Sequence, residues 1–64
     1  MNKMKEIRAR ERVTQFVLAT KTSISQSRLS YFENGWLIPK REEKERIAKA
    51  LGLRPDEVFP ESEE

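Results

Sequence analysis

Cysteine and histidine are both absent from this chain of 64 residues, and their absence limits how so short a sequence can fold. Without cysteine there is no disulfide, no thiolate metal site and no thiol nucleophile. Without histidine the chain lacks the usual general base and the commonest metal ligand. A single core of this size supplies only about 3–5 kcal/mol of net stability unless something staples it. We therefore expect a compact helical domain, stabilised further if it dimerises, that binds no metal and no cofactor.

The net charge of +2 is distributed unevenly along the chain. Of the 13 basic and 11 acidic side chains, residues 1–51 hold 12 and 6, and residues 52–64 hold 1 and 5. A basic body with an acidic end is typical of a protein that binds a polyanion and keeps that end away from it. A charge-rich, solvated surface would give the same counts, so charge alone does not decide between the two. The end itself, residues 60–64, is predicted to be an acidic, solubilising tail.

Apolar runs are too short for a membrane span. The longest ones are four residues, 16–19 and 36–39, whereas roughly 18 apolar residues are needed to cross a bilayer. Residues 1–6 contain no apolar stretch of signal-peptide length. We therefore expect a cytoplasmic protein that makes no membrane contact.

Apolar spacing and capping residues predict five short helices and no strand. Asn2, Thr14 and Ser25 are suitable N-caps, because their side-chain oxygens can accept a hydrogen bond from the first turn. Asn34-Gly35 and Gly52 are suitable helix ends, because these residues tolerate a left-handed backbone. The expected helices cover about 2–11, 15–21, 26–33 and 40–51, followed by a last short helix that begins at Pro55.

The segment 15–32 is predicted to form two short helices joined by a tight turn. Ala19 lies where the helices cross and Ile24 fills the inside of the turn. Leu29 and Phe32 hold the second helix against the core. An α-helix fits the major groove of DNA, where amide, hydroxyl and guanidinium groups can read base edges. Such groups form the outward face of this helix, which has no acidic residue before Glu33: Gln26, Ser27, Arg28, Ser30 and Tyr31.

In residue type and spacing, the chain resembles the lambda-repressor-like family of Xre/Cro-type helix-turn-helix transcriptional regulators. The resemblance covers about residues 4–59 and implies an all-α, compact five-helix DNA-binding domain over residues 1–59. Its recognition helix would be 26–33, and the family usually binds a palindromic operator as a homodimer. The matching segments are 7–8, 14–15, 18–19, 24–30, 33–35, 39, 47–52 and 58–59.

The resemblance also implies roles for individual residues. Gln15 matches a position that commonly binds a DNA phosphate, and Gln26 matches the position of a base reader. Arg8 and Glu33 match a pair that forms a partly buried salt bridge between the first and third helices. Arg28 is expected from its charge and place to contact a phosphate or a guanine. The remaining expected contacts are Ser25, Ser27 and Tyr31 in the groove, and Lys40 and Arg41 on the DNA backbone.

Several residues depart from the family pattern. Ser23 and Arg12 replace glycines, and Ser23 would carry about 1 kcal/mol of strain in a left-handed backbone. Phe16 and Val17 replace polar residues and are therefore expected to be exposed. Lys44 replaces an apolar residue of the fourth helix, which thins the core there.

The apolar loop 36–38 has two interpretations. At least one of its residues is expected to fold over the thinned part of the core. The alternative is a partner or dimer surface formed by Trp36, Leu37 and Ile38 and joined by Phe16 and Val17. For the dimer contact itself the chief candidates are Leu37, Ile38 and Val58. Phe59 is expected in the core instead.

The function predicted from the sequence is non-enzymatic, sequence-specific binding of double-stranded DNA by a small transcriptional regulator, most simply a repressor. No catalytic residue and no small-molecule substrate are expected, because the serines have no base partner. The alternative is a protein-interaction module, such as an antitoxin or a coactivator-like domain that binds a partner protein.

Overall fold

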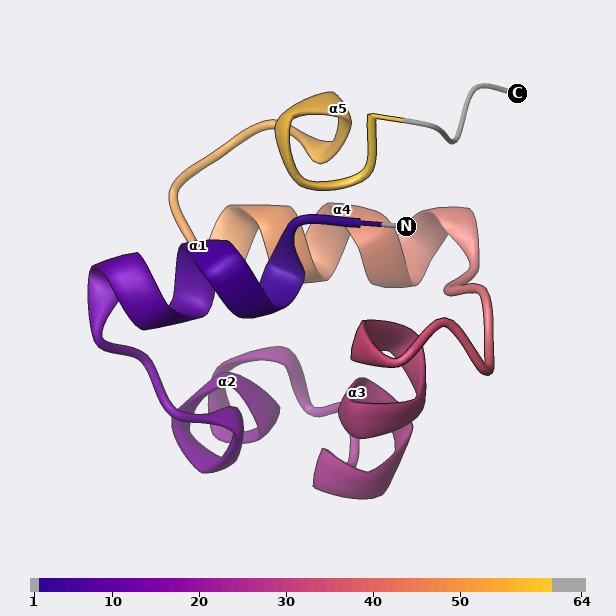
Figure 1. Cartoon of the computed structure of the whole chain (residues 1–64), viewed down its shortest axis with the longest axis horizontal. Helices are drawn as coiled ribbons and strands as arrows, with labels where there is room; N and C mark the ends of the chain where they lie inside the picture. The colour runs from indigo at the N-terminus through magenta and orange to yellow at the C-terminus, as the bar shows by residue number, and fades with distance from the viewer. Residues whose placement is uncertain (1, 61–64) are drawn as a thin grey trace.

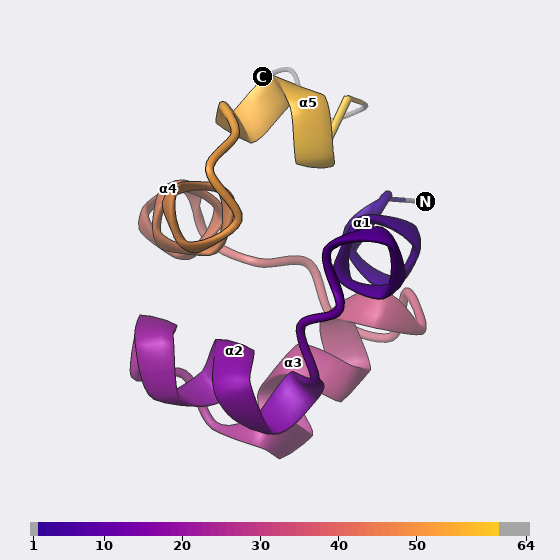
Figure 2. The same cartoon turned by 90° about the vertical axis from the view of Figure 1, so that its left-hand side faces the viewer.

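The computed structural model describes residues 2–60, so the predicted acidic tail lies, apart from Pro60, outside the described residues. In chain order the helices are α1 (Met4–Glu11), α2 (Gln15–Thr22), α3 (Gln26–Glu33), α4 (Arg41–Ala50) and α5 (Pro55–Val58). Figures 1 and 2 show α1 and α4 at the middle level of the molecule, α5 above them, and α2 and α3 below. Residues 2–60 contain no strand, which confirms the all-α, five-helix fold. None of these helices has the length and apolarity that a membrane crossing requires.

Side-chain caps determine where the helices of the lower layer begin. The Thr14 hydroxyl accepts a hydrogen bond from the Val17 N–H at 3.1 Å. The Ser25 hydroxyl accepts one from the Arg28 N–H at the same distance. Both predicted caps are thereby confirmed, and each satisfies an N–H that has no partner within its own helix. Asn2 acts on α1 in a similar way, because its Oδ1 accepts from the Met4 N–H at 3.0 Å, although the helix begins at Met4.

Left-handed residues end several of the helices. Gly35 and Gly52 have φ of 77° and 75°, a conformation that glycine adopts without strain. Arg12, after α1, and Ser23, after α2, have φ of 59° and 61° and carry a Cβ atom. Each of these two residues therefore costs about 1–2 kcal/mol relative to a right-handed backbone.

The core receives side chains from all five helices. α2 packs on α3 and α4, and α4 also packs on α5. The N-terminal segment closes the upper layer, because the Lys3 N–H donates to the Val58 carbonyl oxygen at 2.9 Å. The buried apolar residues are Met4, Ile7, Leu18, Ile24, Leu29, Phe32, Ile47, Ala48, Leu51, Val58 and Phe59.

The packing decides which apolar residues of the C-terminal half belong to the core and which to the surface. Val58 is completely buried, so its assignment to a dimer surface was wrong, whereas Phe59 lies in the core as expected. Leu37 is partly buried and packs against the core. Trp36 and Ile38 remain 74% and 78% exposed. The loop 36–38 therefore contributes one residue to the core and two to the surface.

Lys44 is accommodated at the position where an apolar residue was expected. Its side chain is half-buried, and its ammonium nitrogen lies 6.0 Å from the centroid of the Phe59 ring. A cation over an aromatic face is attracted by the ring's quadrupole. The ring of Phe59 thereby offsets part of the cost of placing a charge at the edge of the core.

Candidate nucleic-acid interface

The turn between α2 and α3 is only three residues long, and buried hydrogen bonds fix its geometry. The Thr22 hydroxyl donates to the Leu18 carbonyl at 2.8 Å and accepts from the Ile24 N–H at 3.2 Å. The Thr22 carbonyl accepts a hydrogen bond from Arg46 Nη1 of α4 at 2.6 Å. With Ile24 buried inside the turn, α2 and α3 are held at one relative angle. The two helices therefore form the helix-turn-helix unit that was expected for residues 15–32.

The first turn of α3 presents polar side chains to solvent. Ser25, Gln26 and Ser27 are all exposed, while Leu29 and Phe32 of the same helix are buried. In Figures 1 and 2 this end of α3 is at the bottom of the molecule, on the side opposite α5. A helix end that projects in this way can enter a groove without obstruction by the other helices.

The surface formed by α2 and α3 contains no available carboxylate. α2 has no acidic residue, and α3 has only Glu33. The Glu33 side chain is 3% exposed and is paired with Arg8. Approach of a phosphodiester backbone to this surface would therefore meet no unpaired negative charge within α2 and α3.

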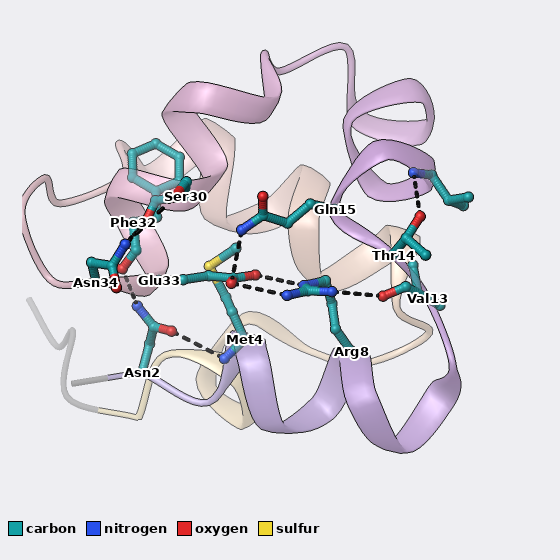
Figure 3. Close-up of polar contacts among 11 residues, drawn as sticks. Asn2, Met4, Arg8, Val13, Thr14, Gln15, Ser30, Phe32, Glu33 and Asn34 are labelled. Carbon is teal, nitrogen blue, oxygen red and sulfur yellow. Dashed lines mark hydrogen bonds and ion pairs between the residues drawn. The ribbon is translucent and has the colours of Figure 1, made fainter.

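Glu33 is the centre of a polar network that joins α1, α2 and α3 (Figure 3). Arg8 forms a two-pronged ion pair with it, Nε to Oε2 at 2.6 Å and Nη2 to Oε1 at 3.0 Å. Arg8 Nη1 also donates to the Val13 carbonyl at 2.9 Å. Gln15 Nε2 donates to Glu33 Oε1 at 3.1 Å. The network places the start of α2 and the end of α3 at a fixed separation.

The side chain of Gln15 is part of this network and is therefore not free to bind a phosphate. Its side chain was expected to bind a phosphate, but its amide already donates to Glu33 inside the protein. Gln15 can still hold a phosphate through its backbone N–H, because the first N–H groups of a helix lack internal partners.

A second two-pronged ion pair, between Arg28 and Glu43, joins α3 to α4. Arg28 Nε lies 2.6 Å from Glu43 Oε2, and Nη2 lies 3.2 Å from Oε1. Glu43 Oε1 also accepts the Lys40 backbone N–H at 2.8 Å, an N-terminal cap of α4. The hydrogen bond from Arg28 lowers the pKa of Glu43 against the opposing effect of burial, and the same bond raises the pKa of Arg28. Both groups are therefore charged at neutral pH.

The Arg28–Glu43 pair was not expected from the sequence. Arg28 was assigned to DNA, whereas its guanidinium is bound within the protein and its Cζ lies 5.2 Å from the centroid of the Phe32 ring. The two partners are 15 residues apart on different helices, so no local spacing rule connects them. The one available signal was an acidic residue three positions after Lys40, the place from which a side chain caps a helix.

Lys40 and Arg41 stand at the start of α4, and both are exposed. Arg41 makes only a long contact to Glu45, 3.8 Å between Nε and Oε2, on an exposed surface. Such contacts contribute little and leave the cation available. Glu43 contacts both Arg28 of α3 and the Lys40 N–H. The backbone from which the Lys40 and Arg41 side chains extend therefore lies close to α3.

Exposed apolar side chains adjoin this region. Phe16 and Val17 of α2 are exposed, as expected from the polar residues that they replace. The ring of Tyr31 packs against Trp36 in the following loop, with 5.8 Å between centroids and a tilt of 32°. Tyr31 is thus turned toward the loop, although it remains on the surface of α3.

Comparison with known proteins points to the same unit. The model of a family described as helix-turn-helix domain matches residues 2–59, which include all five helices. No curated protein and no solved structure matches the chain. The match is consistent with the resemblance to Xre and lambda-repressor-like regulators, and it supports DNA binding. The chain therefore belongs to the helix-turn-helix domain family.

Proposed function

We propose that this protein binds specific sequences in double-stranded DNA and thereby regulates transcription, acting as a repressor. One observation carries the proposal: the exposed polar first turn of α3 lies on a surface without an available carboxylate, within a helix-turn-helix domain. A repressor needs no chemistry, because occupation of an operator excludes other proteins from the same DNA.

In this proposal α3 lies in the major groove. Gln26 reads a base, since a carboxamide can donate to and accept from the edge of an adenine at once. Ser25, Ser27 and Tyr31 contact neighbouring groups in the groove. Lys40 and Arg41, together with the backbone N–H of Gln15, hold the phosphates and orient the helix. Arg28 is assigned to the ion pair with Glu43 and not to this set.

The DNA-bound form is proposed to be a homodimer on a palindromic operator. One recognition helix reads only a few base pairs, which is too little to select a site among the competitors in a genome. Two copies related by a two-fold axis would place their helices about 34–36 Å apart, one turn of the duplex. With Val58 buried and Leu37 packed against the core, the remaining candidates for the dimer surface are Trp36 and Ile38.

Selection from a random-sequence duplex library tests the proposal. Repeated binding and sequencing should enrich one motif with two-fold symmetry, and its affinity should fall steeply as salt increases. The exposed apolar side chains of Phe16, Trp36 and Ile38 favour a partner-binding module instead. Failure to enrich any sequence at low salt would favour that alternative.

A further inference from the structure

Arg28 and Glu43 connect the two parts of the proposed DNA surface. Arg28 is in the first turn of α3, beside the exposed Gln26 and Ser27. Glu43 is in the first turn of α4 and accepts the Lys40 N–H. We propose that Arg28 and Glu43 are positioning residues that determine sequence specificity, because they hold the base-reading face of α3 at a fixed distance and angle from the phosphate-contacting start of α4. This role rests on the proposed DNA binding.

The contact geometry is that of a rigid connection. The guanidinium is planar, and its two short contacts to one carboxylate fix both the separation and the orientation of the groups. The Phe32 ring lies beneath the guanidinium and restricts it further. On the other side, Glu43 is only 10% exposed and its Oε1 is shared between Arg28 and the Lys40 N–H. Movement of Lys40 relative to α3 would therefore break at least one of these contacts.

Together with the Arg8–Glu33 pair, the Arg28–Glu43 pair holds α3 at both of its ends. The last turn of α3 is held through Glu33 to Arg8 of α1, and the first turn is held through Arg28 to Glu43 of α4. Leu29 and Phe32 anchor the middle of α3 in the core, and the two ion pairs hold its ends on either side of these anchors. Discrimination between bases depends on side chains held to within about 0.5 Å of their productive positions. A small tilt would leave phosphate contacts intact and degrade base readout.

The competing explanation is that Arg28 contacts DNA directly. The Arg28 side chain is 36% exposed, so part of the guanidinium can be reached from solvent. In that case Glu43 competes with DNA for Arg28, and neutralising Glu43 would release the guanidinium and strengthen binding. In the positioning role the same change loosens α3 and weakens specific binding. The two explanations thus predict effects of opposite sign for one substitution.

Glu43→Gln is the decisive variant. Its carboxamide oxygen can still accept the Lys40 N–H, so the cap of α4 is retained while the charged partner of Arg28 is lost. The probes are the duplex that the wild-type chain enriches from a random library and a scrambled duplex of the same composition. Glu6→Gln, which neutralises an exposed carboxylate on α1, is the charge-matched control.

We expect Glu43→Gln to reduce the ratio of specific to scrambled affinity by about tenfold, the size of one mismatched base pair. Its affinity for the scrambled duplex should not fall, and Glu6→Gln should keep the wild-type ratio. Arg28→Gln should produce the same loss as Glu43→Gln, and the double variant should lose no more than either single one. Circular dichroism at the binding temperature establishes that each variant is folded.

An unchanged or increased ratio for Glu43→Gln would overturn the positioning role. So would a further loss when Arg28→Gln is added to Glu43→Gln, because that result requires a direct contact by Arg28. If Glu43→Gln does not fold, Glu43→Asp replaces it, since the shorter carboxylate keeps the charge but cannot keep both contacts to Arg28 and the bond to the Lys40 N–H. An intermediate ratio then supports the role, and a wild-type ratio overturns it. If the wild-type chain enriches no sequence at all, the proposed function itself fails, which is a distinct result.

Discussion

At the scale of single residues, Arg12 and Ser23 are the positions where the chain is least suited to its backbone. Both have positive φ and a Cβ atom, and both end a helix of the lower or middle layer. The strain is tolerated because the surrounding hydrogen bonds determine the turn: the Ser23 N–H donates to the Ala19 carbonyl, and the Val13 N–H donates to the Arg8 carbonyl.

Replacing either residue by glycine should stabilise the protein. The relief of strain, about 1–2 kcal/mol, exceeds the added entropy of the unfolded chain, about 0.4–1 kcal/mol. We expect Ser23→Gly and Arg12→Gly each to raise the free energy of unfolding by about 0.5–1 kcal/mol, measured by urea denaturation. Lys21→Gly, in the right-handed last turn of α2, should instead lower it, by at most about 1 kcal/mol. A loss of stability in Ser23→Gly would contradict the assigned strain.

Gln26 and Lys40 should differ in what they contribute to DNA binding. Gln26→Ala should cost about 1–3 kcal/mol on the preferred duplex and abolish discrimination at one base pair, because a base contact is lost. Lys40→Ala should weaken all duplexes alike and reduce the salt slope by about one, because a phosphate contact is lost. Titrations at several salt concentrations measure both effects. The proposed docking is wrong if Gln26→Ala keeps the wild-type base preference.

At the scale of helices, two Arg–Glu pairs attach α3 to the rest of the domain, and neither lies within one helix. Buried ion pairs are costly to desolvate, so their value lies more in geometry than in net stability. Removing one partner is nevertheless damaging, because the other charge remains without compensation.

The Arg8–Glu33 pair should therefore show strong coupling. Arg8→Met or Glu33→Leu alone should each cost about 3 kcal/mol, and the double variant should cost less than the sum. Thermal unfolding of the wild type, the two single variants and the double variant, monitored by circular dichroism, measures the coupling energy. Arg10→Met, which disturbs only the exposed contact of Arg10 with Glu11, should change stability by less than about 1 kcal/mol. Strictly additive effects of the two changes would show that the ion pair is energetically irrelevant.

Glu43 should make the protein sensitive to acid. Its pKa in the folded state lies below the ordinary value of 4.5, chiefly because of the Arg28 hydrogen bond. The unfolded chain therefore takes up a proton first as the pH falls, so the stabilisation by ionised Glu43 is complete well above pH 4.5 and disappears below it. Urea denaturation between neutral and acidic pH should show a smaller decline for Glu43→Gln than for the wild type. Parallel declines would mean that Glu43 titrates alike in both states.

At the scale of the whole molecule, the proposed homodimer requires a contact between two copies on DNA. The exposed Trp36 and Ile38 lie in the loop that leads from α3 to the start of α4, where the proposed phosphate contacts Lys40 and Arg41 lie. Contact between copies through this loop would be formed at the same time as contact with the operator, which makes binding cooperative.

Sedimentation with the selected duplex tests this arrangement. We expect two chains per operator, and Ile38→Glu should reduce cooperativity while leaving the fold intact, because Ile38 is outside the core. Ala9→Glu, which adds the same charge at an exposed position of α1 outside this loop, is the matched control. One chain per operator, or full affinity for a single half-site, would refute the homodimer.

The amino-acid sequence by itself determined the helical class, the order of the helices and most of their ends. These properties depend on local chemistry: the hydroxyls of Thr14 and Ser25 cap the next turn, and Gly52 adopts a left-handed backbone. Only the tertiary structure decided how α3 is held and which apolar residues stay outside. The partners of Arg28 and Gln15 come from other helices, and the burial of Val58 depends on the N-terminal segment and α4. Such contacts join residues far apart in the chain, and periodicity and capping rules describe only neighbours.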